Sequence, residues 1–381
     1  HDPLIFDPSV STTSYKRISE ASGYLGTVQQ GNCVISAFGR LWSAGAADDK
    51  SVIQFSDIQN GQILSTGTAG ELDLSSVWPD GEDEVVAMAA HNNLLYIFGR
   101  RQILSYQDPD DPYTMRVRDT LTGIGCIARD SVQVAGSDVI FLSDTGVRSL
   151  LRTIQEKSAP MRELSINVKD DLIELLGDET LDNIKSVYSD FHAFYLLSLP
   201  ESGVTYCFDA RQVLPNGASR TTTWTNINPT AFLYTKDREL LLGKIGYVGT
   251  YTSNLDNGST YPLIYYTNYF DFGSPTQLKI LKKIAVVFIG NAQATPSLKW
   301  GFDYNNSYFT RSASIENQDV AYYNEDEFGI GTYSTGVFVQ AIKVNVGGAG
   351  AVLQLGIEAN IDGNPLSVQR VDCYVKQGKT L

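Results

Sequence analysis

A repeat of three short β-strands, joined by a polar turn and then by a glycine-containing turn, recurs along the first part of the chain. Between Ser131 and Leu151, apolar runs are separated by Gly136-Ser137-Asp138 and by Asp144-Thr145-Gly146. Glycine accepts the positive φ angles that tight hairpin turns require. The stretch therefore predicts a meander of three strands.

Four further copies of this repeat begin at Thr27, Glu84, Ile184 and Thr230. Their first turns recur at intervals of roughly 45 to 60 residues, a period typical of β-propeller blades with three or four strands each. A blade cannot bury both of its faces alone, so blades stack around an axis. The five copies predict a propeller of five to seven blades, and a stacked β-sandwich is the alternative.

The chain has 381 residues, more than a single hydrophobic core usually serves. Its 21 Tyr and 16 Phe residues suit pleated sheets. After residue 256 the expected strands become longer and alternate in polarity, as in an antiparallel sandwich. We expect an all-β chain, with a β-propeller-like domain over residues 1–256 and a C-terminal antiparallel β-sandwich domain over residues 257–381.

One segment breaks the β pattern. In the sequence INVKDDLIELLG, which ends at Gly177, apolar residues fall at helical spacing on one face. Asn167 is the expected N-cap residue, and Gly177 fits the C′ position. We predict a helix between blades whose leucine face packs into the core.

Residues and motifs typical of catalytic or metal-binding sites are sparse in the sequence. Of the three histidines, His1, His91 and His192, the latter two lie in different repeats, and no nucleophile, phosphate-loop or zinc-protease motif occurs. The Asp144 turn resembles the Asp-box of sialidases but lacks its aromatic residue, so we interpret it as a hairpin tip. We expect no enzymatic activity, and no catalytic, cofactor or metal site.

The four cysteines are far apart, which predicts free, buried thiols and no disulfides. No apolar run reaches the roughly 18 residues needed to cross a bilayer. The chain begins with His1 and not with Met, which fits either a processed chain or a part of a longer product.

Acidic residues exceed basic ones, with a formal net charge of −14. Such a chain repels phosphate backbones, which argues against sequence-specific DNA binding. Acidic clusters occur at Pro79–Glu84, Asp108–Pro112 and Asn324–Glu327. None has the alternating spacing of a calcium-binding loop, so we expect solvated loops.

Three phrases occur in an order similar to that in the tail tubular (nozzle) and tail-hub proteins of short-tailed bacteriophages. They are SVIQFSDIQNGQI from Ser51, VVAMAAHNNLLYIFGRRQILSY from Val85 and GIGCIARDSVQVAGSDVIFLSDTGVRSL from Gly123. The resemblance covers residues 51–211. In the C-terminal part it is strongest at YFDFGSP and KILKKIAVVF.

This resemblance implies a structural virion protein of the tail, with a propeller and no active site. Six copies would surround a channel that retains the genome and then conducts it during ejection. The partners implied are further copies of the chain, a tail adaptor protein below the portal, tail fibres or a tip protein, and double-stranded DNA that passes without sequence-specific binding.

Within this interpretation, acidic side chains on the channel wall repel DNA and prevent its adsorption. The candidate lumen-facing residues are Glu82, Asp83, Glu84, Asp108, Asp110 and Asp111. Three arginines that follow hairpin turns are candidates for inter-subunit contacts, namely Arg40, Arg100 and Arg101. The alternative for these arginines is that they are solvated turn residues.

A β-propeller glycan-binding protein or glycoside hydrolase is the alternative function. It requires exposed tryptophans that stack on sugar rings, with Trp42, Trp78, Trp224 and Trp300 as the candidates, and a hydrolase also requires a carboxylate pair. A third possibility is a propeller scaffold for cellular partners.

Overall fold

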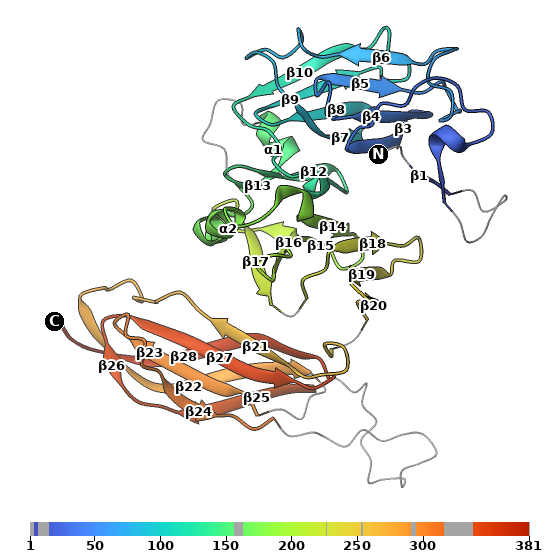
Figure 1. Ribbon diagram of the computed structural model, residues 1–381. Helices are drawn as coiled ribbons and strands as arrows, with labels where there is room; N and C mark the ends of the chain where they lie inside the picture. The colour runs from blue at the N-terminus through green and yellow to red at the C-terminus, as the bar shows by residue number, and fades with distance from the viewer. Residues whose placement is uncertain are drawn as a thin grey trace, which may run out of the picture. The chain divides into compact units, whose positions relative to one another are not determined.

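The computed structural model describes residues 4–6, 15–155, 163–225, 227–252, 254–290, 295–315 and 338–380 (Figure 1). The chain divides into two compact units, His1–Tyr251 and Thr252–Leu381. The division lies slightly before the boundary at residues 256 and 257 that the sequence predicts.

The described part of the N-terminal unit contains five antiparallel sheets that follow one another along the chain (Figure 1). The first consists of β3 (Cys33–Ala37), β4 (Arg40–Ala44), β5 (Val52–Phe55) and β6 (Gly70–Asp73). The second consists of β7 (Val85–His91), β8 (Leu94–Gly99), β9 (Gln102–Gln107) and β10 (Arg116–Thr122). The third consists of β11 (Gln133–Ala135), β12 (Asp138–Ser143) and β13 (Gly146–Ser149).

The fourth sheet consists of β14 (Lys185–Ser189), β15 (Phe194–Leu199), β16 (Val204–Val213) and β17 (Ser219–Trp224). The fifth consists of β18 (Ala231–Tyr234), β19 (Leu240–Lys244) and β20 (Tyr247–Thr250). A separate pair joins β1 (Leu4–Ile5) and β2 (Lys16–Arg17). The five predicted repeats are thus five blade-like sheets, and the predicted all-β, β-propeller-like fold is confirmed.

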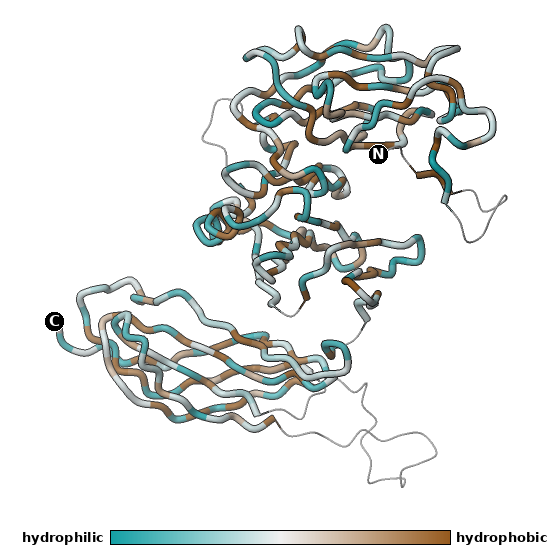
Figure 2. The backbone as a smooth tube through the Cα atoms, in the orientation of Figure 1, coloured by the Kyte–Doolittle hydropathy of each residue, from teal (hydrophilic) through white to brown (hydrophobic). Residues whose placement is uncertain are grey.

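Apolar clusters join each sheet to the next. The continuously apolar sequence of β8 reflects burial on both of its faces. Leu95 and Ile97 belong to the cluster shared with the first sheet, whereas Tyr96 and Phe98 belong to the cluster shared with the third. A strand buried on both faces needs no polar alternation. Figure 2 shows this concentration of apolar residues in the strands.

A polar segment covers the other face of the first sheet. The Gln54 side chain donates to the carbonyl of Thr27 at 2.8 Å and accepts from the backbone N–H of Gln29 at 2.8 Å. Thr27 and Val28, which the sequence places in a strand, belong to this irregular segment.

The outer face of the fifth sheet is not covered in this way, because Leu233 and Val248 on it are 59% and 71% exposed.

The predicted helix is present as α2 (Lys169–Leu176), and Leu172 is fully buried in the cluster between the third and fourth sheets. Its predicted caps are wrong. Val168 occupies the N-cap without a side-chain bond, and Gly177 has a φ of −64°, which is right-handed. Asn167 lies in a 3₁₀ turn, η3 (Ile166–Val168), and accepts a hydrogen bond from Asn216 at 3.1 Å.

The remaining helical segments were not predicted from the sequence. They are α1 (Leu150–Gln155), η1 (Ile18–Glu20), η2 (Arg129–Ser131) and η4 (Leu181–Asn183). Leu150, which the sequence places at the end of a strand, begins α1 instead. Among the described residues, no helix is both long and apolar enough to span a membrane.

The described part of the C-terminal unit is a sandwich of two antiparallel sheets. One has the order β21 (Tyr261–Tyr266), β27 (Leu353–Ile361), β23 (Ser297–Phe302) and β24 (Phe309–Ser312). In the other, β22 (Gln277–Gly290) pairs with β25 (Phe338–Asn345), β26 (Ala349–Gly350) and β28 (Leu366–Thr380). Phe288 of one sheet and Trp300 of the other share one core. The predicted sandwich is confirmed.

Candidate functional site

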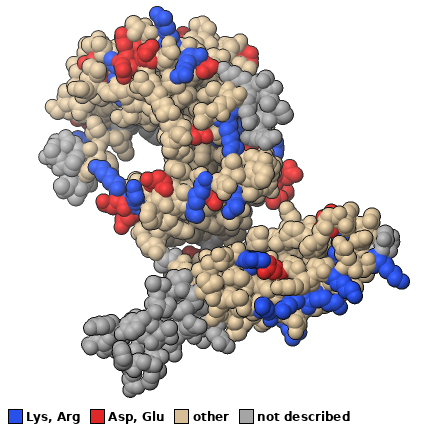
Figure 3. Space-filling model, turned by 180° about the vertical axis from the view of Figure 1, so that it is seen from behind, with Lys and Arg blue, Asp and Glu red and all other residues tan. Residues whose placement is uncertain are grey.

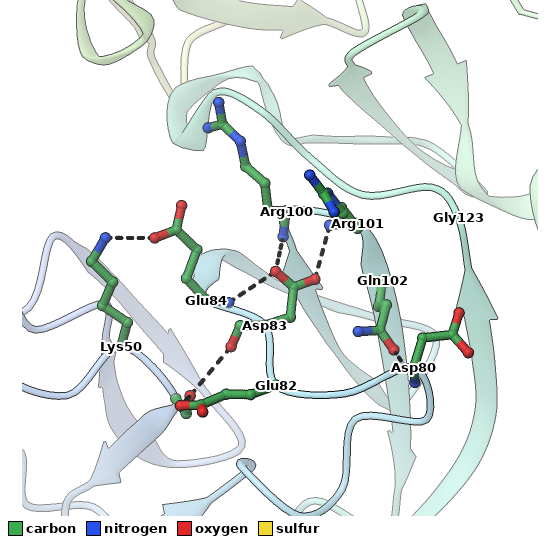
Figure 4. Close-up of a pocket in the computed structure, with 10 residues that line it drawn as sticks. Lys50, Asp80, Glu82, Asp83, Glu84, Arg100, Arg101, Gln102 and Gly123 are labelled. Carbon is green, nitrogen blue, oxygen red and sulfur yellow. Dashed lines mark hydrogen bonds and ion pairs between the residues drawn. The ribbon is translucent and has the colours of Figure 1, made fainter.

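Five of the nine predicted site residues lie together at the junction of the first two sheets. They line an open pocket of about 660 Å³ (Figure 4). Its lining comprises Lys50, Ser51, Asp80, Glu82, Asp83, Glu84, Arg100, Arg101, Gln102 and Gly123. The sequence singles out Glu82, Asp83, Glu84, Arg100 and Arg101, but it does not indicate that they are neighbours.

Asp83 accepts hydrogen bonds from three backbone N–H groups, two of which belong to the β8–β9 turn. Its carboxylate accepts from Glu84 at 2.9 Å, from Arg100 at 3.1 Å and from Arg101 at 2.8 Å (Figure 4). Gly99 leaves room for this contact, because a Cβ there would lie 2.5 Å from the Asp83 carboxylate. Asp83 is therefore bound within its own chain, as a clamp between the loop and the turn.

The neighbouring acidic residues bind the first sheet. Glu84 forms an ion pair with Lys50 at 2.5 Å, and Glu82 accepts a hydrogen bond from the Ser51 hydroxyl at 3.1 Å. The Lys50–Glu84 pair is partly exposed, so solvent screens it and its contribution to stability is small. These contacts link the loop that precedes β7 to the strand connection before β5.

Four carboxylates and three cations line the pocket, so their charges nearly cancel. Arg100 donates to the carbonyl of Ile127 at 3.3 Å. The guanidinium of Arg101 has no hydrogen-bond or ion-pair partner within the described part of the chain. A free guanidinium can bind a carboxylate through two parallel hydrogen bonds. Arg101 is thus the group in this pocket best suited to a partner molecule.

Arg40 was predicted to make an inter-subunit contact, and this prediction is wrong. Its side chain is 5% exposed and donates to the carbonyls of Ser56 at 2.7 Å and Thr68 at 3.0 Å. The guanidinium also lies over the Phe55 ring, 5.7 Å from its centroid. Arg40 is occupied inside its own sheet and cannot reach another subunit.

The second predicted acidic loop does not join this pocket. Asp108, Asp110 and Asp111 are exposed and follow the far end of β9, whereas Arg100 and Arg101 precede its start. A strand of this length separates the two loops by about 20 Å, at about 3.3 Å per residue. The two acidic loops therefore lie at opposite ends of β9 and do not form one site.

The tryptophans do not form the exposed platform that the glycan-binding alternative requires. Trp42, Trp78 and Trp300 are buried, with at most 4% exposure. Trp224 is stacked on Tyr251, with ring centroids 5.7 Å apart, in the cluster between the fourth and fifth sheets. The requirement of the glycan-binding alternative is therefore not met, because three of these side chains fill the cores and Trp224 is partly buried.

The predicted hairpin tip at Ser143–Gly146 is confirmed, and it carries a buried ion pair that the sequence did not reveal. Arg148 donates to Thr145 at 2.7 Å and to the Glu163 carboxylate at 2.7 Å. Lys169 binds the same carboxylate oxygen of Glu163 at 3.1 Å. Desolvation lowers the pKa of Arg148, and the charge of Glu163 opposes that effect.

The histidines do not share a site. His91 ends β7 of the second sheet, and His192 follows β14 of the fourth, stacked on Phe194. His1 and the acidic run Asn324–Glu327 lie outside the described residues. In the described ranges, no group of three His, Cys, Asp or Glu side chains is placed to hold a metal ion.

All four cysteines are free thiols, as the sequence predicts. Burial raises the pKa of Cys33, Cys126 and Cys373 to about 11 and that of Cys207 to about 12.

Because the thiolate is the reactive form, we expect these thiols at pH 8 to react with a disulfide reagent roughly a hundredfold more slowly in the native chain than in denaturant. Absorbance of the released thiol measures both rates, and fast native reaction of any one thiol would contradict the expectation.

No family model matches the sequence, and no curated protein sequence matches it. Similar solved structures include a protein from Lactobacillus plantarum, 14% identical over 65% of this chain and 70% of that chain, with a TM-score of 0.38. PorZ from Porphyromonas gingivalis is 12% identical over 62% of this chain and 26% of that chain, with a TM-score of 0.35. Hsv2 from Kluyveromyces lactis is 9% identical over 55% of this chain and 63% of that chain, with a TM-score of 0.29. These likenesses concern the fold and carry no argument about function.

Proposed function

We propose that the chain is a structural subunit of the tail nozzle of a short-tailed bacteriophage, one of several identical copies around a DNA-conducting channel. The observation that carries the proposal is the position of the three nozzle-like phrases. They fall in order on β5, on β7 to β9 and on β11 to β13, which supply the apolar clusters joining the first three sheets. The resemblance thus concerns the residues that build the sheet array itself.

The distribution of charge supports a wall that repels DNA. Residues 1–251 contain 32 Asp and Glu against 20 Lys and Arg, so −12 of the net charge of −14 belongs to the N-terminal unit. Figure 3 shows both acidic and basic side chains on the visible face of the N-terminal unit, whereas Lys and Arg predominate on that of the C-terminal unit. The exposed loop of Asp108, Asp110 and Asp111 has no cation bound to it within the described residues. It is the better candidate for the channel wall.

Two features favour assembly from several copies. Arg101 lines the pocket between the first two sheets with a guanidinium that no described residue binds, and the fifth sheet exposes Leu233 and Val248. A stable interface usually combines an apolar centre with a polar rim. The adaptor, fibre and DNA partners that the resemblance implies belong to the same proposal.

Sedimentation of the native source material tests the proposed function. We expect the chain to sediment with DNA-filled particles and to stay with their tails after the particles are disrupted. If the chain sediments only as a free monomer, with no particle, the proposal fails.

The variant Arg101→Glu tests the assembly contact. Reversing a charge at an interface leaves like charges facing one another, so we expect the dissociation constant of the oligomer to rise by roughly tenfold or more. Sedimentation equilibrium of the purified chain measures this constant. Arg220→Glu, the same change at an exposed position of the fourth sheet, is the matched control. Equal effects of the two variants would assign the change to net charge and not to the Arg101 contact.

A further inference from the structure

The outer face of the sheet β21-β27-β23-β24 carries a group of tyrosines. Leu355, Ile357 and Trp300 point into the sandwich core. Side chains alternate along a strand, so Gln354, Gly356, Glu358 and Lys299 lie on the opposite face. Tyr266 of β21 pairs with Gly356 in the ladder and belongs to the same face.

Two glycines make room for two tyrosine rings on this face. A Cβ at Gly356 would lie 2.5 Å from the Tyr266 ring, and a Cβ at Gly301 would lie 3.0 Å from the Tyr308 ring. The rings of Tyr266 and Tyr308 therefore cover glycine backbone, and their centroids are 5.1 Å apart. A larger residue at Gly356 would displace the Tyr266 ring, and one at Gly301 would crowd the Tyr308 ring.

A second pair of tyrosines extends the first. The ring centroids of Tyr269 and Tyr304 lie 4.3 Å apart. Desolvation, and after it the neighbouring Tyr308 hydroxyl, raise the pKa of Tyr269. Tyr304 at the end of the group is 71% exposed. Tyr266, Tyr269, Tyr304 and Tyr308 form one continuous aromatic surface, which we call the tyrosine face.

The backbone holds Tyr304 in a conformation that disfavours large residues. The turn from Phe302 to Asn305 closes with a backbone hydrogen bond of 3.0 Å, and both central residues, Asp303 and Tyr304, have positive φ angles of 54° and 57°. This is the signature of a type I′ turn, whose second central position prefers glycine. Strained backbone of this kind clusters at ligand sites. At Tyr304 the turn holds an exposed aromatic ring at a position where the stability of the turn favours glycine.

The polar groups beside the rings carry no net charge. Glu358 accepts from the Tyr266 hydroxyl at 2.6 Å and pairs with Lys299 at 2.7 Å. Gln354 accepts from the Tyr308 hydroxyl at 2.5 Å. Aromatic rings with hydroxyl, amide and paired charged groups match a ligand that has apolar C–H faces and many hydroxyls. A polyanion would find no excess positive charge among them.

We propose that the tyrosine face binds a neutral carbohydrate chain, with sugar rings stacked on Tyr304 and its neighbours and hydroxyls bonded to Lys299, Glu358 and Gln354. The inference goes beyond the tail function proposed above and does not depend on it. It also differs from the tryptophan platform of the glycan-binding alternative, because it lies on tyrosines of the C-terminal unit.

An array of neutral bacterial surface polysaccharides and oligosaccharides, probed with the full chain, tests the proposal. We expect the native chain to bind at least one neutral glycan. We expect Tyr304→Gly to bind it roughly tenfold more weakly, since one aromatic contact is lost. This variant should fold at least as well as the native chain, because glycine suits the turn. Weak binding by Tyr304→Gly therefore cannot be assigned to misfolding, and its melting temperature checks this.

Two further variants sharpen the test. Tyr304→Phe keeps the ring and should keep most of the affinity. Tyr247→Ala removes an exposed tyrosine of the fifth sheet in the N-terminal unit and should change nothing. The proposal is overturned if no neutral glycan binds, if Tyr304→Gly binds as well as the native chain, or if only charged polymers bind and added salt releases them.

Discussion

Replacing Trp42 with alanine is expected to lower the free energy of unfolding of the N-terminal unit by about 3 to 5 kcal/mol. Trp42 has no exposed surface and packs against Phe55, with ring centroids 5.4 Å apart, in the cluster between the first two sheets. The substitution leaves a cavity, and it also removes the bond of 3.0 Å from the indole N–H to the carbonyl of Ala37. The cavity and the lost hydrogen bond both lower the free energy of unfolding.

Scanning calorimetry of the chain measures this effect as a shift of the N-terminal transition, with the C-terminal transition as an internal reference. Ile245→Ala is the control, because Ile245 is 92% exposed and its replacement should change stability by less than about 0.5 kcal/mol. A loss below about 1 kcal/mol for Trp42→Ala would show that the first two sheets are not joined by this core.

Replacing Glu163 with methionine is expected to cost about 3 to 5 kcal/mol, because it leaves the buried guanidinium of Arg148 without its charge partner. The side chains of Arg148 and Glu163 are only 7% and 5% exposed. The remaining partners of Arg148, the Ser143 and Thr145 hydroxyls, are neutral. They cannot compensate for the lost carboxylate.

The double variant Arg148→Met with Glu163→Met is expected to recover most of this stability, since both charges are then absent from the core. Urea denaturation of the native chain, the two single variants and the double variant gives the coupling energy. Additive single effects would contradict the buried ion pair.

Much of the architecture was predictable because its signals are local. The turn glycines and apolar runs between Ser131 and Leu151 define three strands within about twenty residues, and β11, β12 and β13 are there. The apolar run of β8 and the alternating strands after residue 256 likewise reflect how many faces of each strand are buried. The spacing of Leu172 and its neighbours predicted the helix α2. It did not predict the residue at which the helix begins, because helix ends depend on the flanking backbone.

The surroundings of individual side chains were decided by the tertiary structure alone. Arg40 and Arg100 both follow a hairpin turn in the sequence. Arg40 is nevertheless buried and donates to the Ser56 carbonyl, whereas Arg100 lines a pocket. Arg148 and Glu163 are separated by fifteen positions and become partners only when the segment that contains Glu163 and Leu164 packs along β13 of the third sheet. The tyrosine face joins Tyr266 and Tyr308, which lie on separate strands of one sheet.

The amino-acid sequence by itself thus determined that the chain forms blade-like sheets followed by a sandwich, because strand and turn preferences act between neighbours in the chain. Only the tertiary structure decided which charges are free, which tryptophans are buried and where tyrosines gather. Those properties depend on packing between residues far apart in sequence, which no local pattern records.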